Sequence, residues 1–319
     1  MSGHSTLNTD HLIRSNLWSS DLKEVLEDEL MAQKYVKMIT EFPDGDTLNI
    51  PSIGQMEAQD YQEGDAIRYT AMDTGNFTFT IDQYKSTATY ITNKMKQDSY
   101  LMSQLVSSFV PKQARALAKA METKILRVGP EAQTSANSNT INDAKHRFVA
   151  SGTSETLVFE DFAKAGYALF KANVPMQNMV AIIDPTAWHQ LATQTNVVNL
   201  LTPQPMWGSM VSEGSLSGMH FKAHIYGFDV YVSQNLKRLT ASETIDSVTA
   251  AAGVCNIFFS AASDLMPIVG HVRQAPTVES EYNKDLQRDE YLTVCRYGYK
   301  LFRPENFVTV ISDTDQVYA

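Results

Sequence analysis

The 319-residue sequence has no block of basic residues, no long apolar run and only two cysteines. Its 26 Lys and Arg residues are scattered among 36 Asp and Glu residues, and the formal net charge is −10. A protein that grips nucleic acid usually carries a basic stripe, so sequence-specific nucleic-acid binding is not expected. No apolar run approaches the about 18 residues of a membrane helix, and residues 1–18 lack the apolar segment of a secretory signal. We therefore expect no membrane partner.

The two cysteines, Cys255 and Cys295, lie in the strand-like runs GVCNIFFS and YLTVCRYGY. So low a cysteine content in such runs predicts two buried thiols in a reducing compartment. A single disulfide between the two is the alternative.

Motifs that carry phosphate or nucleophile chemistry are also missing. Neither GxGxxG nor GxxxxGK[ST] occurs in the sequence. The run GSLSG at 214–218 has Leu216 where a nucleophile elbow needs serine. Carboxylate-rich stretches at 24–29 and 279–291 are more typical of solvated or ion-pairing surfaces than of a tuned catalytic pair.

Three histidines are candidate metal ligands or catalytic bases. His220 and His224, in HFKAH, have the spacing of a helical zinc pair, but the alternation around them predicts a strand and a surface or interface role. His189 lies on a predicted short helix, where a packed, hydrogen-bonded histidine is more common than a catalytic base. We therefore expect no enzyme, no catalytic residue, no cofactor and no metal site.

The chain is 43% apolar and 19% charged, enough for a substantial core and about two domains. In the first half of the chain, periodicity and capping signals predict a polar arm at 1–18, a helix at 21–38, a β-hairpin at 47–95, a short helix from 98 that stops at Pro111, and a long helix at 111–128 capped by Gly129. A polar loop at 130–149 and a helix at 155–173 are expected next. The second half is predicted to contain a buried strand at 179–183, a helix from Pro185 capped by Asp184, and strands at 221–233, 254–263, 289–302 and 303–312. Helices and strands mix without a βαβ rhythm, so the expected class is α+β.

The returning limb of the predicted hairpin changes the parity of its apolar positions midway. Phe77, Phe79 and Ile81 share one face, whereas Tyr84 and Tyr90 fall on the other. A parity change of this kind predicts a bulge or bend in the strand. A long hairpin is only marginally stable alone in water, so it needs another surface to cover it.

The order of these elements resembles that of the major capsid proteins of tailed bacteriophages, which have the Hong Kong 97 capsid fold. The stretches that carry the resemblance are ARALAKAMETKILRVG at 114–129, ETLVFEDFAKAGYALFKANVPMQNMVAIIDPTAWHQL at 155–191, IYGFDVYVSQNL at 225–236 and RYGYKLFRPENFVTV at 296–310. Each motif alone is weak evidence for the family. The resemblance rests on the order and spacing of the motifs over roughly residues 45–310.

The resemblance implies an N-terminal arm, an extended loop, a spine helix, and peripheral and axial domains. The corresponding ranges are 1–45 for the arm with its short helix, 46–97 for the extended loop, 98–178 for the peripheral domain with the spine helix at about 111–128, 179–268 for the axial domain, and 269–319 for the C-terminal strands. It also implies a shell of pentamers and hexamers around a double-stranded DNA genome. The expected partners are copies of the chain itself, a separate scaffolding protein, a portal and a decoration protein. The expected location is the virion, after synthesis in the bacterial cytoplasm.

In the family the extended loop lies across a neighbouring subunit. On this reading Phe77, Phe79 and Ile81 bury against another chain, and Tyr84 and Tyr90 bury against their own. The polar middle of the loop carries the charged residues Glu57, Asp60, Glu63, Asp65, Arg68 and Asp73. We expect this acidic tip to dock near basic groups of the next subunit, with Arg273, Lys284 and Arg288 as candidates.

Reversing the charge of Glu63 and Asp65 to lysine tests that docking. The double variant is expected to fold normally and to assemble poorly, because the opposite charges that attract the basic groups are lost. Thermal unfolding checks the fold, and electron microscopy checks the shells. Normal shells from the variant would contradict the docking.

Two other readings are open at this stage. An encapsulin-type nanocompartment shares the fold and encloses a cargo enzyme, although the arm at 1–18 does not clearly resemble its cargo-holding helix. A soluble enzyme or binding module with an unfamiliar site is the other, and it would form only a small closed oligomer.

Overall fold

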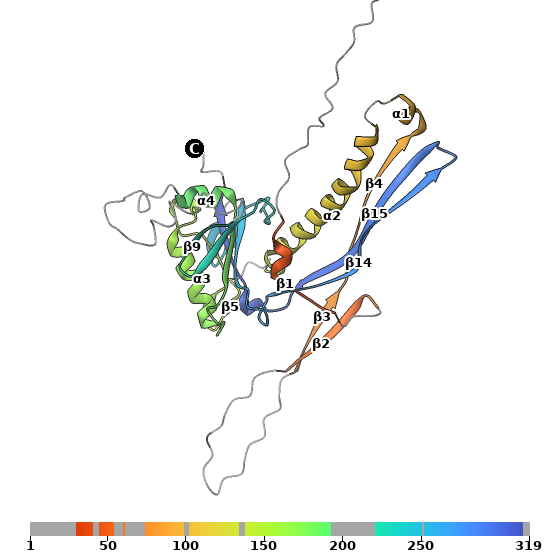
Figure 1. Cartoon of the computed structure of the whole chain (residues 1–319). Coiled ribbons are helices and arrows are strands. Elements are labelled where there is room, and N and C mark those ends of the chain that lie inside the picture. The colour runs from red at the N-terminus through yellow and green to blue at the C-terminus, as the bar shows by residue number, and fades with distance from the viewer. Residues whose placement is uncertain are drawn as a thin grey trace, which may run out of the picture.

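A computed structural model describes residues 30–40, 45–53, 60, 74–98, 102–133, 138–192, 221–250 and 252–314. Two sheets organise these residues (Figure 1). The first has the order β1-β14-β15-β4, with β1 at Val36–Met38, β4 at Gln83–Thr92, β14 at Ile268–Asn283 and β15 at Arg288–Leu301. The second has the order β7-β16-β13-β8-β10-β9, with β7 at Arg147–Val149, β8 at Met179–Ile183, β9 at Phe221–Ile225, β10 at Phe228–Val232, β13 at Gly253–Ser260 and β16 at Val308–Asp313.

Three two-stranded sheets and the helices complete the fold. The small sheets are β2–β3 (Thr47–Ile53 and Thr74–Thr80), β5–β6 (Thr140–Ile141 and Ala144–Lys145) and β11–β12 (Glu243–Ile245 and Val248–Ala250). The α-helices are α1 (Asn93–Asp98), α2 (Met102–Ala132), α3 (Phe159–Lys171) and α4 (Pro185–Ala192), and short 3-10 helices span Ala32–Tyr35, Thr153–Glu155 and Pro304–Asn306. In Figure 1, α2 lies alongside the four-stranded sheet, and α3 and α4 accompany the six-stranded sheet.

Both faces of the six-stranded sheet are buried at its central strand β8. On one face Phe162 of α3 packs edge-to-face against Phe258, with ring centroids 5.1 Å apart. On the other face Ile182 belongs to a cluster that includes Leu117 and Ile125 of α2. Because both faces of β8 are covered, every residue of the strand is apolar, and its sequence is MVAII. The predicted strand at 179–183 is confirmed, and the α+β class is confirmed with it.

Helix α2, the predicted spine helix, is longer than the sequence predicts. Helix α2 runs without interruption for 31 residues and contains Pro111 and Gly129 inside it. A proline removes one hydrogen bond, and packing of a long helix against a sheet compensates for that loss. Gly129 does not end the helix either: a Cβ at this position would overlap the ring of Phe307, so the glycine allows the buried ring to approach. The predicted stop and the predicted cap were both wrong.

The segment before the hairpin also differs from the prediction. The described part of the predicted 21–38 helix is a 3-10 turn followed by β1, which pairs in parallel with β14. The backbone N–H groups of Met31 and Ala32 donate to the carboxylate of Glu122 on α2, at 3.1 and 2.8 Å. Since Glu122 is buried, this pair of hydrogen bonds ties the N-terminal segment to the spine helix.

The predicted domain ranges stay predictions, and the residues on either side of position 178 pack into one sheet. Residues of β7 and α3 precede that position, yet they pack with the six-stranded sheet. The predicted polar loop at 130–149 likewise contains β5, β6 and β7. The predicted C-terminal strands do divide between the two sheets, because β14 and β15 join one and β16 the other. Which body is axial and which is peripheral refers to a capsomer and stays a prediction.

Candidate assembly surface

The returning limb of the hairpin leaves one sheet for another at Ile81 and Asp82. Strand β3 pairs with β2, from Thr74 opposite Ile53 to Thr80 opposite Thr47. After the two-residue break β4 pairs with β15 instead. The parity change in the sequence is therefore confirmed as a bend, and the hairpin proper ends at Thr80 rather than near residue 97.

A glycine of β15 lies beneath this bend. A Cβ on Gly298 would stand 2.7 Å from the carbonyl oxygen of Thr80 and 2.9 Å from the Cα of Ile81. Both are backbone atoms that cannot move aside without shifting the hairpin. The glycine in RYGY thus permits the close approach that lets the hairpin leave the body of the protein at this point.

The apolar residues of the bend belong to their own chain. Phe79 and Ile81 are 0% and 5% exposed and cluster with Val269 of β14. Phe77 stacks edge-on against Phe302, with ring centroids 4.9 Å apart. Phe79 and Ile81 are therefore buried within their own chain rather than against another subunit, contrary to the prediction. Phe77 is only half-buried, and its contact with another subunit stays a prediction.

Tyr84 and Tyr90 are exposed, although the sequence predicts that they are buried within their own chain. Their exposed fractions are 68% and 57%. Helix α2 covers the other face of the sheet, where Thr293 and Cys295 are fully buried and Thr293 donates to Gln113 of α2 at 3.0 Å. The two tyrosines therefore point away from the spine helix.

Cross-strand register identifies the other residues on the same side. Ala88 lies opposite Leu292, Leu292 opposite Glu279, and Tyr90 opposite Glu290, and residues that face each other across strands share a side of the sheet. We call this side the open face. Its members are Tyr84, Ser86, Ala88, Tyr90, Glu279, Glu281, Arg288, Glu290 and Leu292. The sequence did not reveal it, because the run VESEYN of β14 has no apolar alternation that predicts a strand.

The basic residues proposed for docking do not form one patch. Arg288 lies on the open face, where its Nε donates to Glu290 at 2.7 Å and its guanidinium stacks over Tyr90 at 4.5 Å. The hydrogen bond from Arg288 lowers the pKa of Glu290. Lys284 is exposed in the adjacent β14–β15 turn. Arg273 lies roughly 35 Å from Lys284 along the strand, at a rise of about 3.3 Å per residue.

The acidic middle of the extended loop cannot be placed against these groups. Asp60 is exposed, and Glu57, Glu63, Asp65, Arg68 and Asp73 lie outside the described residues. The inter-subunit role of this segment stays a prediction.

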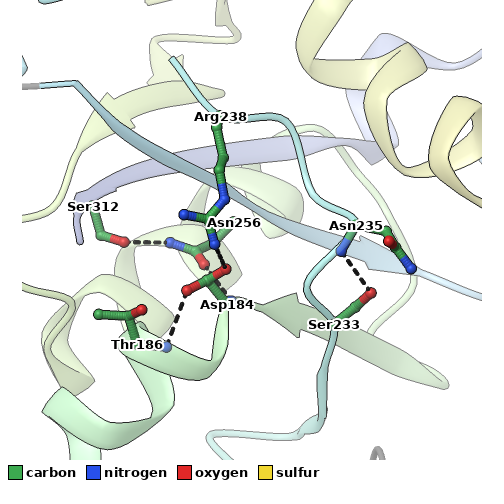
Figure 2. A network of polar contacts seen from close by, with 7 residues as sticks. All are labelled: Asp184, Thr186, Ser233, Asn235, Arg238, Asn256 and Ser312. Carbon is green, nitrogen blue, oxygen red and sulfur yellow. Dashed lines mark hydrogen bonds and ion pairs between the residues drawn. The ribbon is translucent and has the colours of Figure 1, made fainter. Parts of the chain in front are cut away.

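A buried polar cluster at the end of β8 has the composition of an active site but a structural role (Figure 2). Asp184 is 1% exposed and accepts hydrogen bonds from the backbone N–H of Thr186 at 3.0 Å and from Nη2 of Arg238 at 3.1 Å. Its own N–H donates to Asn256, which in turn donates to Oγ of Ser312 at 2.8 Å. The cluster confirms the predicted cap and joins β8, β13 and β16.

The other candidates for chemistry stand apart from one another. Nδ1 of His224 lies 2.8 Å from Asp229 on an exposed surface, and His220 lies outside the described residues. His189 is exposed on α4 rather than packed. Cys255 and Cys295 are both buried and free, so the two-thiol prediction is confirmed over the disulfide. Within the described ranges, no three His, Cys, Asp or Glu side chains gather as a metal site requires, and no helix is long and apolar enough to cross a membrane.

Comparison with solved structures identifies the fold. A chain from Mycobacterium phage Che8 is 18% identical, with a TM-score of 0.67, over 94% of this chain and 97% of that one. A chain from the capsid of cyanophage P-SCSP1u is 13% identical, with a TM-score of 0.68, over 94% and 93%. One from the cyanophage Pam1 capsid is 12% identical, with a TM-score of 0.67, over 98% and 99%.

Neither a family model nor a curated protein matches the sequence. The structural likeness nevertheless covers nearly the whole chain. This chain therefore has the Hong Kong 97-like fold of phage capsid chains, as its sequence predicts.

Proposed function

We propose that the chain is a major capsid protein that assembles as pentamers and hexamers into an icosahedral shell. The observation that carries this proposal is the near-complete overlap with chains from phage capsid structures. Such a role is structural and asks no chemistry of the subunit. It places the protein in the virion, after synthesis in the bacterial cytoplasm.

Exposed features of the fold support an assembling subunit. The open face displays two tyrosines and Leu292 to solvent, and the β2–β3 hairpin projects from the body of the protein (Figure 1). Contacts between such different surfaces are heterologous, and heterologous contacts close into rings. The open face is where we place a neighbouring subunit, and the acidic middle of the extended loop is the segment proposed to reach the basic groups near the β14–β15 turn.

The net charge of −10 supports a container that holds DNA without binding it tightly. A scaffolding protein, a portal and a decoration protein are further partners that such a shell implies. The structures compared are phage capsids, which favours a virus shell over an encapsulin. Particles purified from infected cells distinguish the two: packaged DNA supports the capsid, and a cargo enzyme supports the encapsulin.

Particle formation tests the proposal directly. The purified chain, expressed alone or with a scaffolding protein, is expected to form capsomers or megadalton shells. Size-exclusion chromatography with light scattering and negative-stain microscopy measure this. A monomer, or a closed oligomer that is neither a pentamer nor a hexamer, under every condition with the scaffolding protein present would contradict the function.

A further inference from the structure

An aromatic residue occupies a backbone position that disfavours it. Tyr226 and Gly227 form the two-residue turn between β9 and β10, with φ of 47° and 83°, and Ile225 pairs with Phe228 to close it. Turns with two positive φ values favour Asn-Gly, because a bulky side chain at positive φ is strained. Tyr226 nonetheless stands there with 49% of its surface exposed. The packing of Tyr226 within its own chain does little to offset this backbone strain, so we look for a contact of its ring with another molecule.

A hollow that suits such a ring lies at the other edge of the same sheet. It measures about 370 Å³, is partly open to solvent and is formed by β7, α3 and the β11–β12 hairpin. Its apolar lining comes from Phe148, Val149, Tyr167, Ala168, Ile245 and Val248. Tyr167 and Val248 are themselves 55% and 54% exposed. The hollow therefore presents an apolar surface that the described residues of its own chain leave half uncovered.

Strand register places the hollow further along the sheet than the Tyr226 turn, because Arg147 of β7 is level with Tyr231 of β10. Strands β8 and β10 are parallel, β13 is antiparallel to both β8 and β16, and β7 is parallel to β16. The Tyr226 turn begins β10, and the hollow begins beside Lys145, just before β7. Four strand spacings of about 4.8 Å separate β7 from β10, and the offset of five residues along the strands adds to that distance, so the features lie more than about 20 Å apart. A chain cannot fill its own hollow with its own Tyr226.

Charges beside the two features are complementary. Asp229, exposed next to the turn, carries a carboxylate on the Tyr226 edge. Lys145 and Lys164 line the hollow, with side chains 56% and 44% exposed. Lys145 pairs with Asp246 at 2.9 Å and lowers the pKa of that carboxyl. The lining holds three basic side chains, Lys145, Arg147 and Lys164, and two carboxylates, Asp143 and Asp246, so its formal charge toward an incoming Asp229 is +1.

We propose that Tyr226 of one copy inserts into the hollow of the next copy around a capsomer. The inference rests on the proposed function and names one contact of the ring. A turn at one edge and a hollow at the opposite edge give the head-to-tail contact that a ring repeats. A buried tyrosine at the centre of an apolar pocket is a typical anchor of a protein interface.

Disulfide cross-linking tests whether residue 226 of a neighbouring copy occupies the hollow. A chain that carries both Tyr226→Cys and Val248→Cys is oxidised after assembly, and the products are separated on a denaturing, non-reducing gel. A ladder of covalently joined chains is expected, and neither single variant should give one, because both native cysteines are buried. Shells that yield only single chains would overturn the contact. Failure of the unmodified chain to form any particle would instead overturn the proposed function.

A second variant separates assembly from folding. Asparagine suits a positive φ, so Tyr226→Asn is expected to keep or raise the Tm of the unassembled chain while raising the concentration needed for assembly at least about tenfold. Tyr226→Phe keeps the ring and is the matched control, expected to assemble close to normally. Assembly of Tyr226→Asn at the unmodified concentration would overturn the proposal.

Discussion

Replacing Phe79 with alanine is expected to lower the free energy of unfolding by about 3–5 kcal/mol. The ring is fully buried among Ile81, Val269 and Phe302, where the hairpin meets the four-stranded sheet. Alanine would leave a cavity where the end of β3 packs against β14 and Phe302, one of the contacts that anchor β2–β3 to the rest of the chain. Because a two-stranded hairpin is marginal alone, loss of the anchor should also loosen it.

Two measurements check this prediction. Urea denaturation of the unassembled chain gives the free energy, and hydrogen exchange of amides in Thr47–Ile53 and Thr74–Thr80 reports on the hairpin. Tyr84→Ala is the control, expected to change the free energy by no more than about 0.5 kcal/mol because its side chain is exposed. A loss below about 1 kcal/mol for Phe79→Ala would show that another chain, and not this one, normally covers the ring.

The second large effect concerns the open face. The double variant Tyr84→Asp, Tyr90→Asp is expected to fold as well as the unmodified chain and to form no shells. Both side chains are more than half exposed in the free subunit, so the change costs little there. In a subunit interface each new carboxylate would be desolvated without a partner, at a cost of at least about 2 kcal/mol per contact.

Thermal unfolding and negative-stain microscopy measure the two outcomes. Lys85→Glu is the matched control, because it also makes the chain more negative by two charges. Lys85 lies on β4 between residues of the open face, so its side chain points to the opposite side of the sheet. This control is expected to assemble. Shells from the double tyrosine variant would contradict the assignment of the open face as a subunit contact, and failure of both variants would attribute the loss to net charge.

The sequence predicted local features whose cause is local. The bend after Ile81 follows from the parity of neighbouring side chains, and the Asp184 cap follows from an aspartate placed before a proline. The buried strand β8 follows from its unbroken apolar run. In each case the interactions that determine the feature lie within a few residues along the chain, so the local sequence is enough to predict it.

The candidate assembly surface was predicted less well. Alternation shows that the two faces of a strand differ, but not which face a distant segment covers. The buried and exposed side chains of the returning limb, β3 with β4, were predicted the wrong way round because their covers, α2 on one side of the sheet and Val269 with Phe302 beside the bend, come from remote parts of the chain. The open face includes β14, whose polar run gave no strand signal.

By itself, then, the sequence determined the α+β class, the helices α3 and α4, the buried strand β8 and the place where the hairpin bends, since periodicity, caps and turns express these over short distances. Only the tertiary structure decided that α2 continues through Pro111, that Phe79 is internal and that Tyr84 and Tyr90 are exposed. Those outcomes depend on long-range packing, in which the burial of a side chain is set by whichever segment reaches it.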